Sequence, residues 1–329
     1  MTLKFNNVYV GEASTVGGPM ESKSPYKNYF DKLHDSYYID KKSLEKSEGI
    51  LAKESIDILL NKSKLKLDDI NLIIGGDLQN QIMASSYASN KFNKAFLGVY
   101  SACATSIEEI IIGSSLIESN NLNNIICVTS SHNLAQEKQF RNPIEYGAPK
   151  AKTCGFTVTG GASILLTNNK TSIKVSSGTI GKIVDLNQTN VNNMGAVMAP
   201  AAADTIYNHL QSLDESVNDY DLILTGDLGM YGKEILKDYM KEEYNITLNN
   251  YNDCGFLIYD LEKTKNKISG GSGPVCSALI NYSYIYNLLK TKKLKKVLLV
   301  ATGALFSPNY VFQRNNLLGI AHAICLEAI

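Results

Sequence analysis

The chain has 329 residues, 44% hydrophobic and 19% charged, a composition typical of a globular protein long enough for two domains or one large fold of two halves. Its 32 basic and 32 acidic residues give a formal net charge of zero, so nothing electrostatic points to nucleic acid or to an anionic membrane as a partner. No apolar stretch approaches the roughly 18 residues of a membrane span, and the start of the chain lacks the apolar region of a secretory signal, so we expect a cytoplasmic protein.

The first half of the chain shows strands that alternate with helices. Residues 69–78 (DINLIIGGDL), 95–100 (AFLGVY) and 125–130 (IICVTS) are apolar runs typical of buried strands. Small residues at 101–106 form a turn, and an apolar helix over 107–117 follows it. The predicted order is therefore strand, strand–turn–helix, strand.

Three segments depart from this pattern. Residues 22–47, rich in Lys, Tyr and Asp, are predicted to form a surface excursion, and residues 136–153 a long irregular loop of the kind that often carries function. Residues 183–200 resemble a crossover between halves. Proline is favoured at the first position of a helix, so Pro200 is predicted to open a helix over 201–210.

The second half repeats the first. Residues 219–228 (DYDLILTGDL) match residues 69–78 at six of ten positions with an offset of 150. A turn of small residues at 269–278 leads into an apolar helix over 279–289, and a strand at 297–302 follows. Parallel order across three elements indicates an internal duplication.

Strands that alternate with helices favour parallel sheets covered by helices. We therefore predict an α/β fold of two halves, residues 1–185 and 186–329, which stack with a central pair of helices between their sheets.

Cys103 is the candidate nucleophile among six cysteines. None of the six forms a CxxC pair and no His/Cys spacing resembles a zinc site, so most are expected to be small buried hydrophobes in a reducing compartment. Cys103 follows a buried strand and precedes a helix, where the helix dipole and unpaired N–H groups favour a thiolate. A cysteine in such a turn can also be purely structural.

Two of the four histidines are candidates for a site around Cys103. His132 follows the strand at 125–130, at the end where a parallel sheet presents its ligand-facing residues. His322 lies near the end of the chain. Either could line a pocket, and either could equally be a buried histidine with its hydrogen bonds satisfied. His34 and His209 are expected to be structural or solvated.

The chain has only two arginines, Arg141 and Arg314, and all its other basic residues apart from histidine are lysines. Arginine presents a planar fork that binds a carboxylate through two hydrogen bonds. Arg141 lies in the irregular loop with Gln139 and Tyr146, a set that suits an anionic ligand. The alternative is a structural salt bridge, which we favour for Arg314.

Eight segments, in the same order, resemble the stage V sporulation protein AD family of endospore-forming bacteria. The resemblance runs from about residue 5 to the end of the chain and rests on these segments: YFDKLHDSYY, GGDLQNQI, TSSHNLAQEKQFRNPIEYGAPK, MGAVMAPAAADTI, DLILTGDLG, DCGFLIYD, ATGALFSP and GIAHAICLE. It implies a thiolase-like fold, with duplicated α/β halves and helices layered between and outside two mixed sheets. It also implies a role in moving dipicolinic acid into the developing spore and out on germination.

The resemblance implies a site without condensing activity. Thiolases hold their acyl-accepting cysteine at the position of Cys103 and supply a base and oxyanion donors, usually His and Asn, from loops of the second half. Those loops correspond here to Gly226-Asp227 and Gly270-Gly271-Ser272, which contain neither His nor Asn. The second turn departs from the family's Gly-Cys-x-Cys-Ser, since it reads Gly-Pro-Val-Cys-Ser from residue 273.

We therefore expect a non-condensing thiolase homologue, not an enzyme, that binds dipicolinic acid, free or as its calcium chelate, without a cofactor or a bound metal of its own. The expected ligand-binding residues are Cys103, His132, Gln139, Arg141, Tyr146, Asp227 and His322. The expected partners are a second copy of the chain and other stage V sporulation A-type proteins, which would hold this cytoplasmic protein at the spore inner membrane. The alternatives are an acyltransferase or thioesterase that uses Cys103 with His322, and a purely structural subunit of a membrane channel complex.

Overall fold

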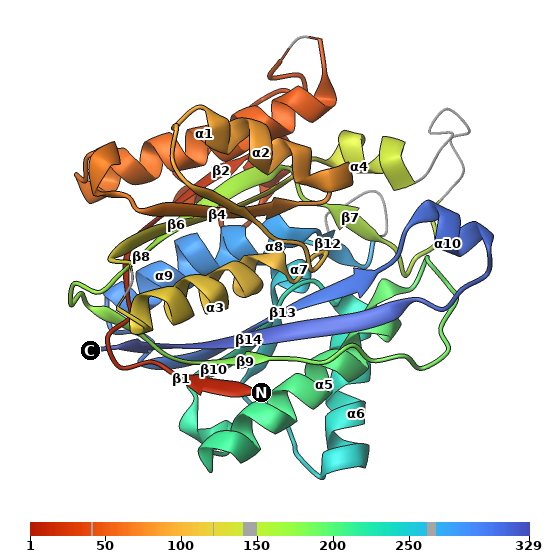
Figure 1. Cartoon of the computed structure of the whole chain (residues 1–329). Helices are drawn as coiled ribbons and strands as arrows, with labels where there is room; N and C mark the ends of the chain where they lie inside the picture. Colours follow the sequence, from red (N-terminus) through yellow and green to blue (C-terminus); the bar gives the residue numbers. More distant parts are fainter. Residues whose placement is uncertain (41, 121, 141–149, 262–267) are drawn as a thin grey trace.

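The computed structural model describes the chain apart from residues 41, 121, 141–149 and 262–267. Helices and sheets alternate in layers, with helices outside both sheets and between them (Figure 1). The predicted α/β architecture with a central helical layer is confirmed. No helix in the described part of the chain is long and apolar enough to span a bilayer.

Hydrogen bonds join the strands into one continuous order, and the five strands on one side of its centre have counterparts on the other side. The first five strands of the path, from its centre to one edge, are β2 (Tyr9–Gly17), β8 (Gly160–Thr167), β6 (Asn124–Ser131), β4 (Leu72–Asp77) and β5 (Phe96–Gly98). Their counterparts toward the other edge are β9 (Ile173–Ile180), β14 (Leu318–Ala328), β13 (Lys296–Leu305), β10 (Leu222–Thr225) and β11 (Tyr251–Asp253). The two sheets meet at the pairing of Tyr9 with Lys174 along the β2–β9 contact.

Strand pairing adds two details to the predicted halves. β9 precedes the predicted boundary at residue 185 but pairs along its length with β14, a strand of the second half. Each sheet is mixed rather than fully parallel, as the resemblance implied, because β8 and β14 run antiparallel to β6 and β13. Between β6 and β8 the described residues form α4 (Asn133–Phe140) and β7 (Gly155–Thr157), and β8 returns antiparallel to β6.

The remaining strands are short. β1 (Thr2–Lys4) and β3 (Lys32–Leu33) pair with β9 and β2, whereas β7 pairs in parallel with β12 (Gly270–Ser272) apart from the main sheets. This small β7–β12 ribbon joins the irregular loop of the first half to the glycine-rich turn of the second.

The central layer holds α3 (Thr105–Glu118) opposite the continuous segment α8 (Pro274–Ile280), η7 (Asn281–Ile285) and α9 (Tyr286–Lys290). Both helices are apolar on most sides because each contacts two sheets and its neighbour. The hydroxyl groups of Ser106 and Ser277 hydrogen-bond across the layer at 3.0 Å. The predicted equivalence of the turns at 101–106 and 269–278 is thus visible as two helices that meet near their N-termini.

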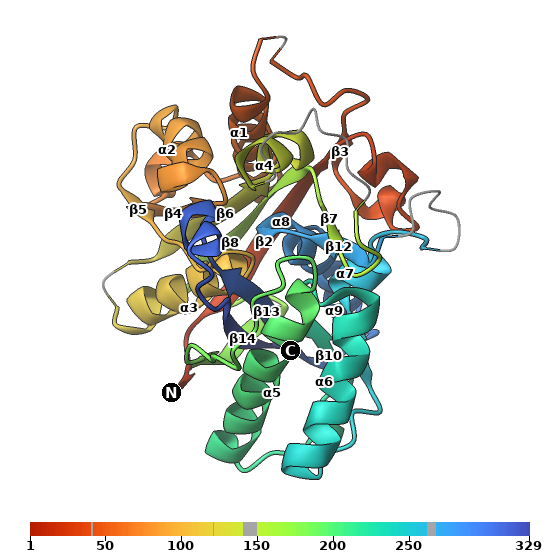
Figure 2. The same cartoon turned by 90° about the vertical axis from the view of Figure 1, so that its right-hand side faces the viewer.

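The outer layers cover the far faces of the two sheets (Figure 2). The helices outside the first sheet are α1 (Leu44–Ser63), α2 (Met83–Asn90) and α4, and those outside the second are α5 (Met194–Leu213) and α6 (Gly229–Tyr244). The short helices are α7 (Cys254–Leu257), α10 (Pro308–Phe312), η1 (Glu21–Lys23), η2 (Lys27–Tyr29), η3 (Leu67–Asp69), η4 (Asn80–Ile82) and η6 (Val217–Asp219).

Two local predictions were wrong. Pro200 does not open a helix, because α5 begins at Met194, where the Asn193 side chain caps the first turn by accepting a hydrogen bond from the Ala196 N–H group. Pro200 is buried within α5, so packing offsets the missing hydrogen bond. The loop predicted from residue 136 is helical as far as Phe140, since α4 extends to that residue.

Candidate functional site

A cavity of about 100 Å³ lies where the carboxyl ends of β4, β5, β10 and β13, the turn before α3 and the β7–β12 ribbon meet. Both halves of the chain contribute to it, as does the crossover between them. Its principal lining side chains are Tyr100, Cys103, Gln136, Glu137, Phe140, Thr153, Cys154, Thr157, Val191, Asn192, Met194, Asp227, Ser269, Ser272 and Phe306. Among the described lining residues there is no Lys, Arg or His.

Cys103 reaches this cavity from a tight turn directly before α3. Ala102 adopts a left-handed conformation with φ of 50°, which is uncommon for a residue with a Cβ atom and marks a constrained turn. The Thr105 hydroxyl donates to the Ala102 carbonyl at 2.7 Å and accepts from the Ser101 N–H group at 3.0 Å. The turn packs so closely against β13 that a Cβ atom on Gly303 would lie 2.5 Å from the Ser101 carbonyl oxygen. The predicted position of Cys103 beside a helix N-terminus is confirmed.

The prediction that this position favours a thiolate was wrong. Burial raises the pKa of the Cys103 thiol well above its usual range, and the neighbouring Asp227 carboxylate raises that pKa further. Both side chains line the same cavity.

Asp227 follows β10 and points into the cavity, as the sequence predicted for a site residue. Its Oδ2 atom accepts from the Ser272 hydroxyl at 3.0 Å and from the Gly273 N–H group at 3.1 Å, and its Oδ1 atom accepts from the Thr302 hydroxyl at 2.8 Å. Burial raises the pKa of the Asp227 carboxyl group, whereas these donors lower it. In the sequence, Ser272 was considered only as a residue without an imidazole or amide group. The contact of Thr302 with Asp227 was not predicted.

A second buried carboxylate, Asp253, holds the loop that carries Asp227. It accepts hydrogen bonds from the Leu228 and Gly229 N–H groups at 3.0 and 2.9 Å, and from the Thr225 hydroxyl at 2.7 Å. Asp253 also caps α7 through the Phe256 N–H group. Sequence reasoning missed this role, although the segment DCGFLIYD was one of those that carried the family resemblance.

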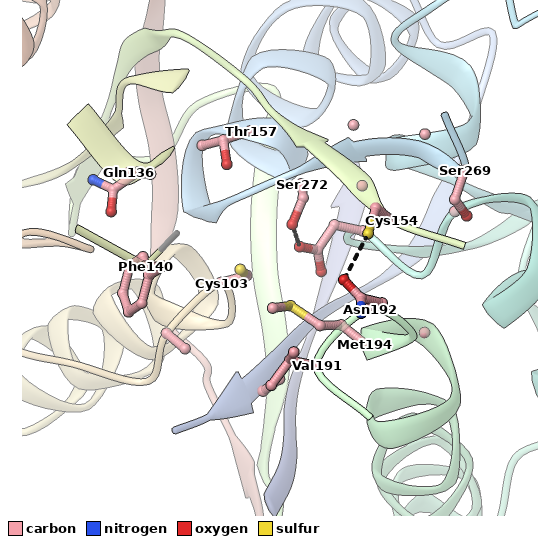
Figure 3. A pocket seen from close by; sticks show the side chains of 18 of the residues that line it. Cys103, Gln136, Phe140, Cys154, Thr157, Val191, Asn192, Met194, Ser269 and Ser272 are labelled. Carbon is pink, nitrogen blue, oxygen red and sulfur yellow. Dashed lines mark hydrogen bonds between the residues drawn. The ribbon is translucent and has the colours of Figure 1, made fainter. Parts of the chain in front are cut away.

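The wall opposite Cys103 contains a second thiol. Cys154 precedes β7 and hydrogen-bonds with the Asn192 side-chain oxygen at 3.3 Å, which ties the first half to the crossover (Figure 3). Met194 and Val191 extend into the same cavity from the crossover, and Phe140 closes another side. No group of three or more His, Cys, Asp or Glu side chains that could hold a metal occurs in the described ranges.

His132 does not line the cavity, contrary to the prediction. Its Nε2 atom lies 2.9 Å from the Tyr37 carbonyl oxygen and its Nδ1 atom accepts from the Ala135 N–H group at 3.4 Å. The fully buried ring therefore supports the start of α4, and burial lowers its pKa. Gln139 also stays outside the cavity, because its amide bridges the Leu78 carbonyl and the Asn80 N–H group.

His322 is held away from the thiol. Its Nδ1 atom accepts from the Gly181 N–H group at 3.2 Å, so in the neutral ring the proton lies on Nε2, 3.3 Å from the Ser101 hydroxyl. Burial lowers the pKa of His322 to about 4. The prediction that His322 lines the pocket was wrong, and the geometry of a Cys103–His322 pair is not formed.

The other predicted site residues include Arg141 and Tyr146, which lie outside the described residues. Arg314 is exposed and does not line the cavity. His209 is buried between Thr179 and Tyr220, to which its ring nitrogens lie at 2.7 and 3.1 Å, and His34 contacts Glu54, so the structural interpretation of both rings is confirmed.

Comparisons with known proteins agree with this geometry. The family described as stage V sporulation protein AD matches residues 1–327. Stage V sporulation protein AD of Bacillus subtilis (strain 168) is 40% identical over 320 residues, which cover 97% of this chain and 94% of that protein. Solved structures with the same fold include two condensing-type proteins. A variant of OleA from Xanthomonas campestris bound with cerulenin matches with a TM-score of 0.64 at 14% identity and covers 99% of this chain and 98% of its own. The 3-oxoacyl-[acyl-carrier-protein] synthase III of Aquifex aeolicus VF5 matches with a TM-score of 0.57 at 12% identity and covers 97% and 99%.

Proposed function

Since this chain belongs to the stage V sporulation protein AD family, we propose that it binds dipicolinic acid (pyridine-2,6-dicarboxylate) for uptake into the developing spore and release on germination. In this proposal the protein is cytoplasmic and meets the spore inner membrane through other stage V sporulation A-type proteins. The cavity beside Cys103 is the binding site.

The observation that carries this proposal is a cavity that Cys103 shares with a carboxylate and with no described imidazole. A condensing enzyme needs an imidazole or an equivalent base next to its nucleophile and neutral donors for the oxyanion. Here Asp227 lines the cavity with Cys103, and no described histidine does. A pocket in a condensing-enzyme fold whose described lining has no imidazole suits binding better than condensation.

Because dipicolinate carries two negative charges, its binding site needs a source of positive charge. Glu137 is paired with Lys150 at 2.6 Å, and the charge of Asp227 is shared among its donors. A dipicolinate dianion still requires added positive charge. Arg141, which follows the lining residue Phe140 in the sequence, is the proposed source for the free ligand. A bound calcium ion would neutralise the ligand itself, so we expect calcium to increase the affinity.

Titration calorimetry with dipicolinate, with and without calcium, tests the proposal. Charge-assisted hydrogen bonds contribute roughly 1.5–3 kcal/mol each, and about 1.4 kcal/mol corresponds to tenfold in affinity. Arg141→Ala is therefore expected to weaken binding of the free ligand by about tenfold to a hundredfold. Arg141→Lys should recover little, because an ammonium group lacks the planar fork.

Two further variants complete the test. Cys103→Leu should block the cavity, because the larger side chain enters it directly. Arg314→Ala, the control at the chain's other arginine, should bind like the parent. If Arg141→Ala and Cys103→Leu both bind dipicolinate like the parent, the ligand lies elsewhere and the site assignment fails.

The alternative, an acyltransferase or thioesterase that uses Cys103 with His322, rests on the condensing-enzyme fold. The two hydrogen bonds of His322 and its low pKa oppose it. Incubation with an acyl-CoA followed by intact-mass measurement decides between them, since rapid stoichiometric acylation with turnover would support the enzyme.

We also propose a homodimer. β5 is the edge strand of the first sheet, and the apolar side chains of Leu97 and Tyr87 near it are 40% and 66% exposed. Pairing of two β5 edges would bury both side chains and satisfy the free backbone groups. Sedimentation should show a dimer for the parent and a monomer for Leu97→Asp. A monomeric parent would rule out this arrangement.

A further inference from the structure

The turn between β4 and α2 holds two consecutive residues in a left-handed backbone conformation. Gln81 has a φ of 62° and Ile82 a φ of 51°. Such values are uncommon for a residue with a Cβ atom, and for a β-branched side chain such as that of isoleucine they are a genuine outlier. A strained backbone persists only where the surrounding structure holds it in place. The turn therefore needs contacts that keep it closed.

A side-chain amide from another helix supplies such a contact. Gln139 lies in α4, 59 residues after Asn80 in the sequence. Its Nε2 atom donates to the Leu78 carbonyl at 2.8 Å, and its Oε1 atom accepts from the Asn80 N–H group at 3.2 Å. The two hydrogen bonds fix successive peptide groups directly before the strained residues. The amide therefore opposes any movement of the turn away from α4.

The same contact joins two parts of the cavity wall. The Leu78 side chain lines the cavity and packs with Ala102 and Cys103 in one small apolar cluster. Phe140, the residue after Gln139, also lines the cavity and packs against this cluster. Because Leu78 is bound through its own carbonyl group, a shift of the turn would move its side chain relative to Cys103.

We infer that Gln139 is a positioning residue of the cavity, which holds the strained turn closed and keeps Leu78 packed against the turn that carries Cys103. The inference deepens the proposed binding function and rests on it only for the identity of the ligand. Without the two hydrogen bonds the strained residues relax, and Leu78 moves away from the cavity. Relief of one strained residue shifts such an equilibrium by roughly fivefold to a hundredfold.

The other contacts of the turn come from the sheet that it follows. The Asp77 carboxylate accepts from the Gln79 and Ser85 N–H groups, each at 2.8 Å. The Ile82 side chain packs on β5 so closely that a Cβ atom on Gly98 would lie 2.2 Å from its Cδ1 atom. These contacts fix the ends of the turn to the first sheet, whereas the glutamine amide ties the turn to α4.

Alkylation of Cys103 by iodoacetamide in the folded, ligand-free protein at one pH measures how well the wall is closed. Gln139→Ala should make Cys103 react at least about fivefold faster. Gln139→Glu should also accelerate the reaction, because a carboxylate can accept from the Asn80 N–H group but cannot donate to the Leu78 carbonyl.

Substitution of Ile82 tests whether strain drives the opening. Asparagine tolerates the left-handed conformation, so adding Ile82→Asn to Gln139→Ala should return the rate close to that of the parent. Valine is β-branched like isoleucine, so adding Ile82→Val should not. A merely structural loss at Gln139 would not be repaired by one of these substitutions and left unrepaired by the other.

Two controls separate this effect from general loosening. Lys138→Ala removes an ion pair of α4 with Glu45 at 2.6 Å and should leave the rate unchanged. Cys127, fully buried in β6, should stay unreactive in every variant. The inference is wrong if Gln139→Ala does not accelerate Cys103, if Cys127 accelerates with it, or if asparagine and valine restore the rate equally.

Titration calorimetry with dipicolinate then links the wall to binding. The affinity should fall in Gln139→Ala, recover with Ile82→Asn and stay low with Ile82→Val. If the alkylation rates follow this order but no variant, including the parent, binds dipicolinate, the proposed ligand is wrong and the positioning role of Gln139 stands. If dipicolinate binds equally to all of them, Gln139 does not position the binding site.

Discussion

Glu21 should make the stability of the fold depend on pH. The side chain lies in η1 and is fully buried, and its Oε1 atom accepts hydrogen bonds from the Tyr259 hydroxyl and, at 3.2 Å, from the Thr159 N–H group. Among the described residues, its Oε2 atom has no hydrogen-bond partner. Burial raises the pKa of this carboxyl group from 4.5 to about 7.

The direction of this pH dependence follows from the linkage between protonation of Glu21 and folding. A carboxyl group with a raised pKa binds a proton more tightly in the folded chain, so its favourable contribution is complete below pH 4.5 and is lost as the pH rises to about 7. Each pKa unit corresponds to about 1.4 kcal/mol, so the loss amounts to about 3 kcal/mol over this window. Glu21→Gln, which cannot ionise, should lack this loss.

Urea denaturation of the parent and of Glu21→Gln, followed by circular dichroism from pH 4.5 to 8, measures the effect. Relative to the parent, the variant should gain about 3 kcal/mol in the free energy of unfolding across this range. The other buried carboxyl groups are common to both proteins, so the difference isolates Glu21.

Glu118→Gln is a control for which stability should change with pH in the opposite direction. Hydrogen bonds from Asn6 and Asn7 lower the pKa of Glu118 against the effect of burial, so its stabilising contribution is present at neutral pH and lost on acidification. Stability curves of the parent and of Glu21→Gln that run parallel from pH 4.5 to 8 would show that Glu21 takes up no proton on folding.

Two other substitutions test how the site is supported. Gly303→Ala should lower the free energy of unfolding by about 1–3 kcal/mol and weaken dipicolinate binding, because its Cβ atom would lie 2.5 Å from the Ser101 carbonyl oxygen. Urea denaturation measures the stability and calorimetry the affinity. An unchanged affinity would contradict the close contact. His322→Ala should destabilise the fold by about 1–3 kcal/mol, because it leaves the Gly181 N–H group unpaired. The variant should still bind dipicolinate nearly as well as the parent protein. A variant that folds normally but no longer binds would show that His322 belongs to the site.

The outline of the fold could be predicted from the amino-acid sequence. The repeated segments at 69–78 and 219–228 became β4 and β10, which occupy equivalent places in the two sheets. These patterns were readable because strands and helices buried on nearly all sides leave long apolar runs. The position of Cys103 directly before α3 was readable for a similar reason, since small residues between a buried strand and a buried helix predict a tight turn.

The surroundings of the thiol could not be predicted in this way, because they depend on contacts between distant parts of the chain. His132 and His322 are candidates from their place in the chain, but each ring is held by partners distant in sequence, Tyr37 and Gly181. Asp227 acquires its role from Ser272 and Thr302, which are 45 and 75 residues away. Hydrogen bonds of this kind depend on the register of strands and the depth of turns, and neither leaves a periodic signal in the sequence. The pKa of the thiol likewise depends on burial, and residues from both halves of the chain surround this side chain.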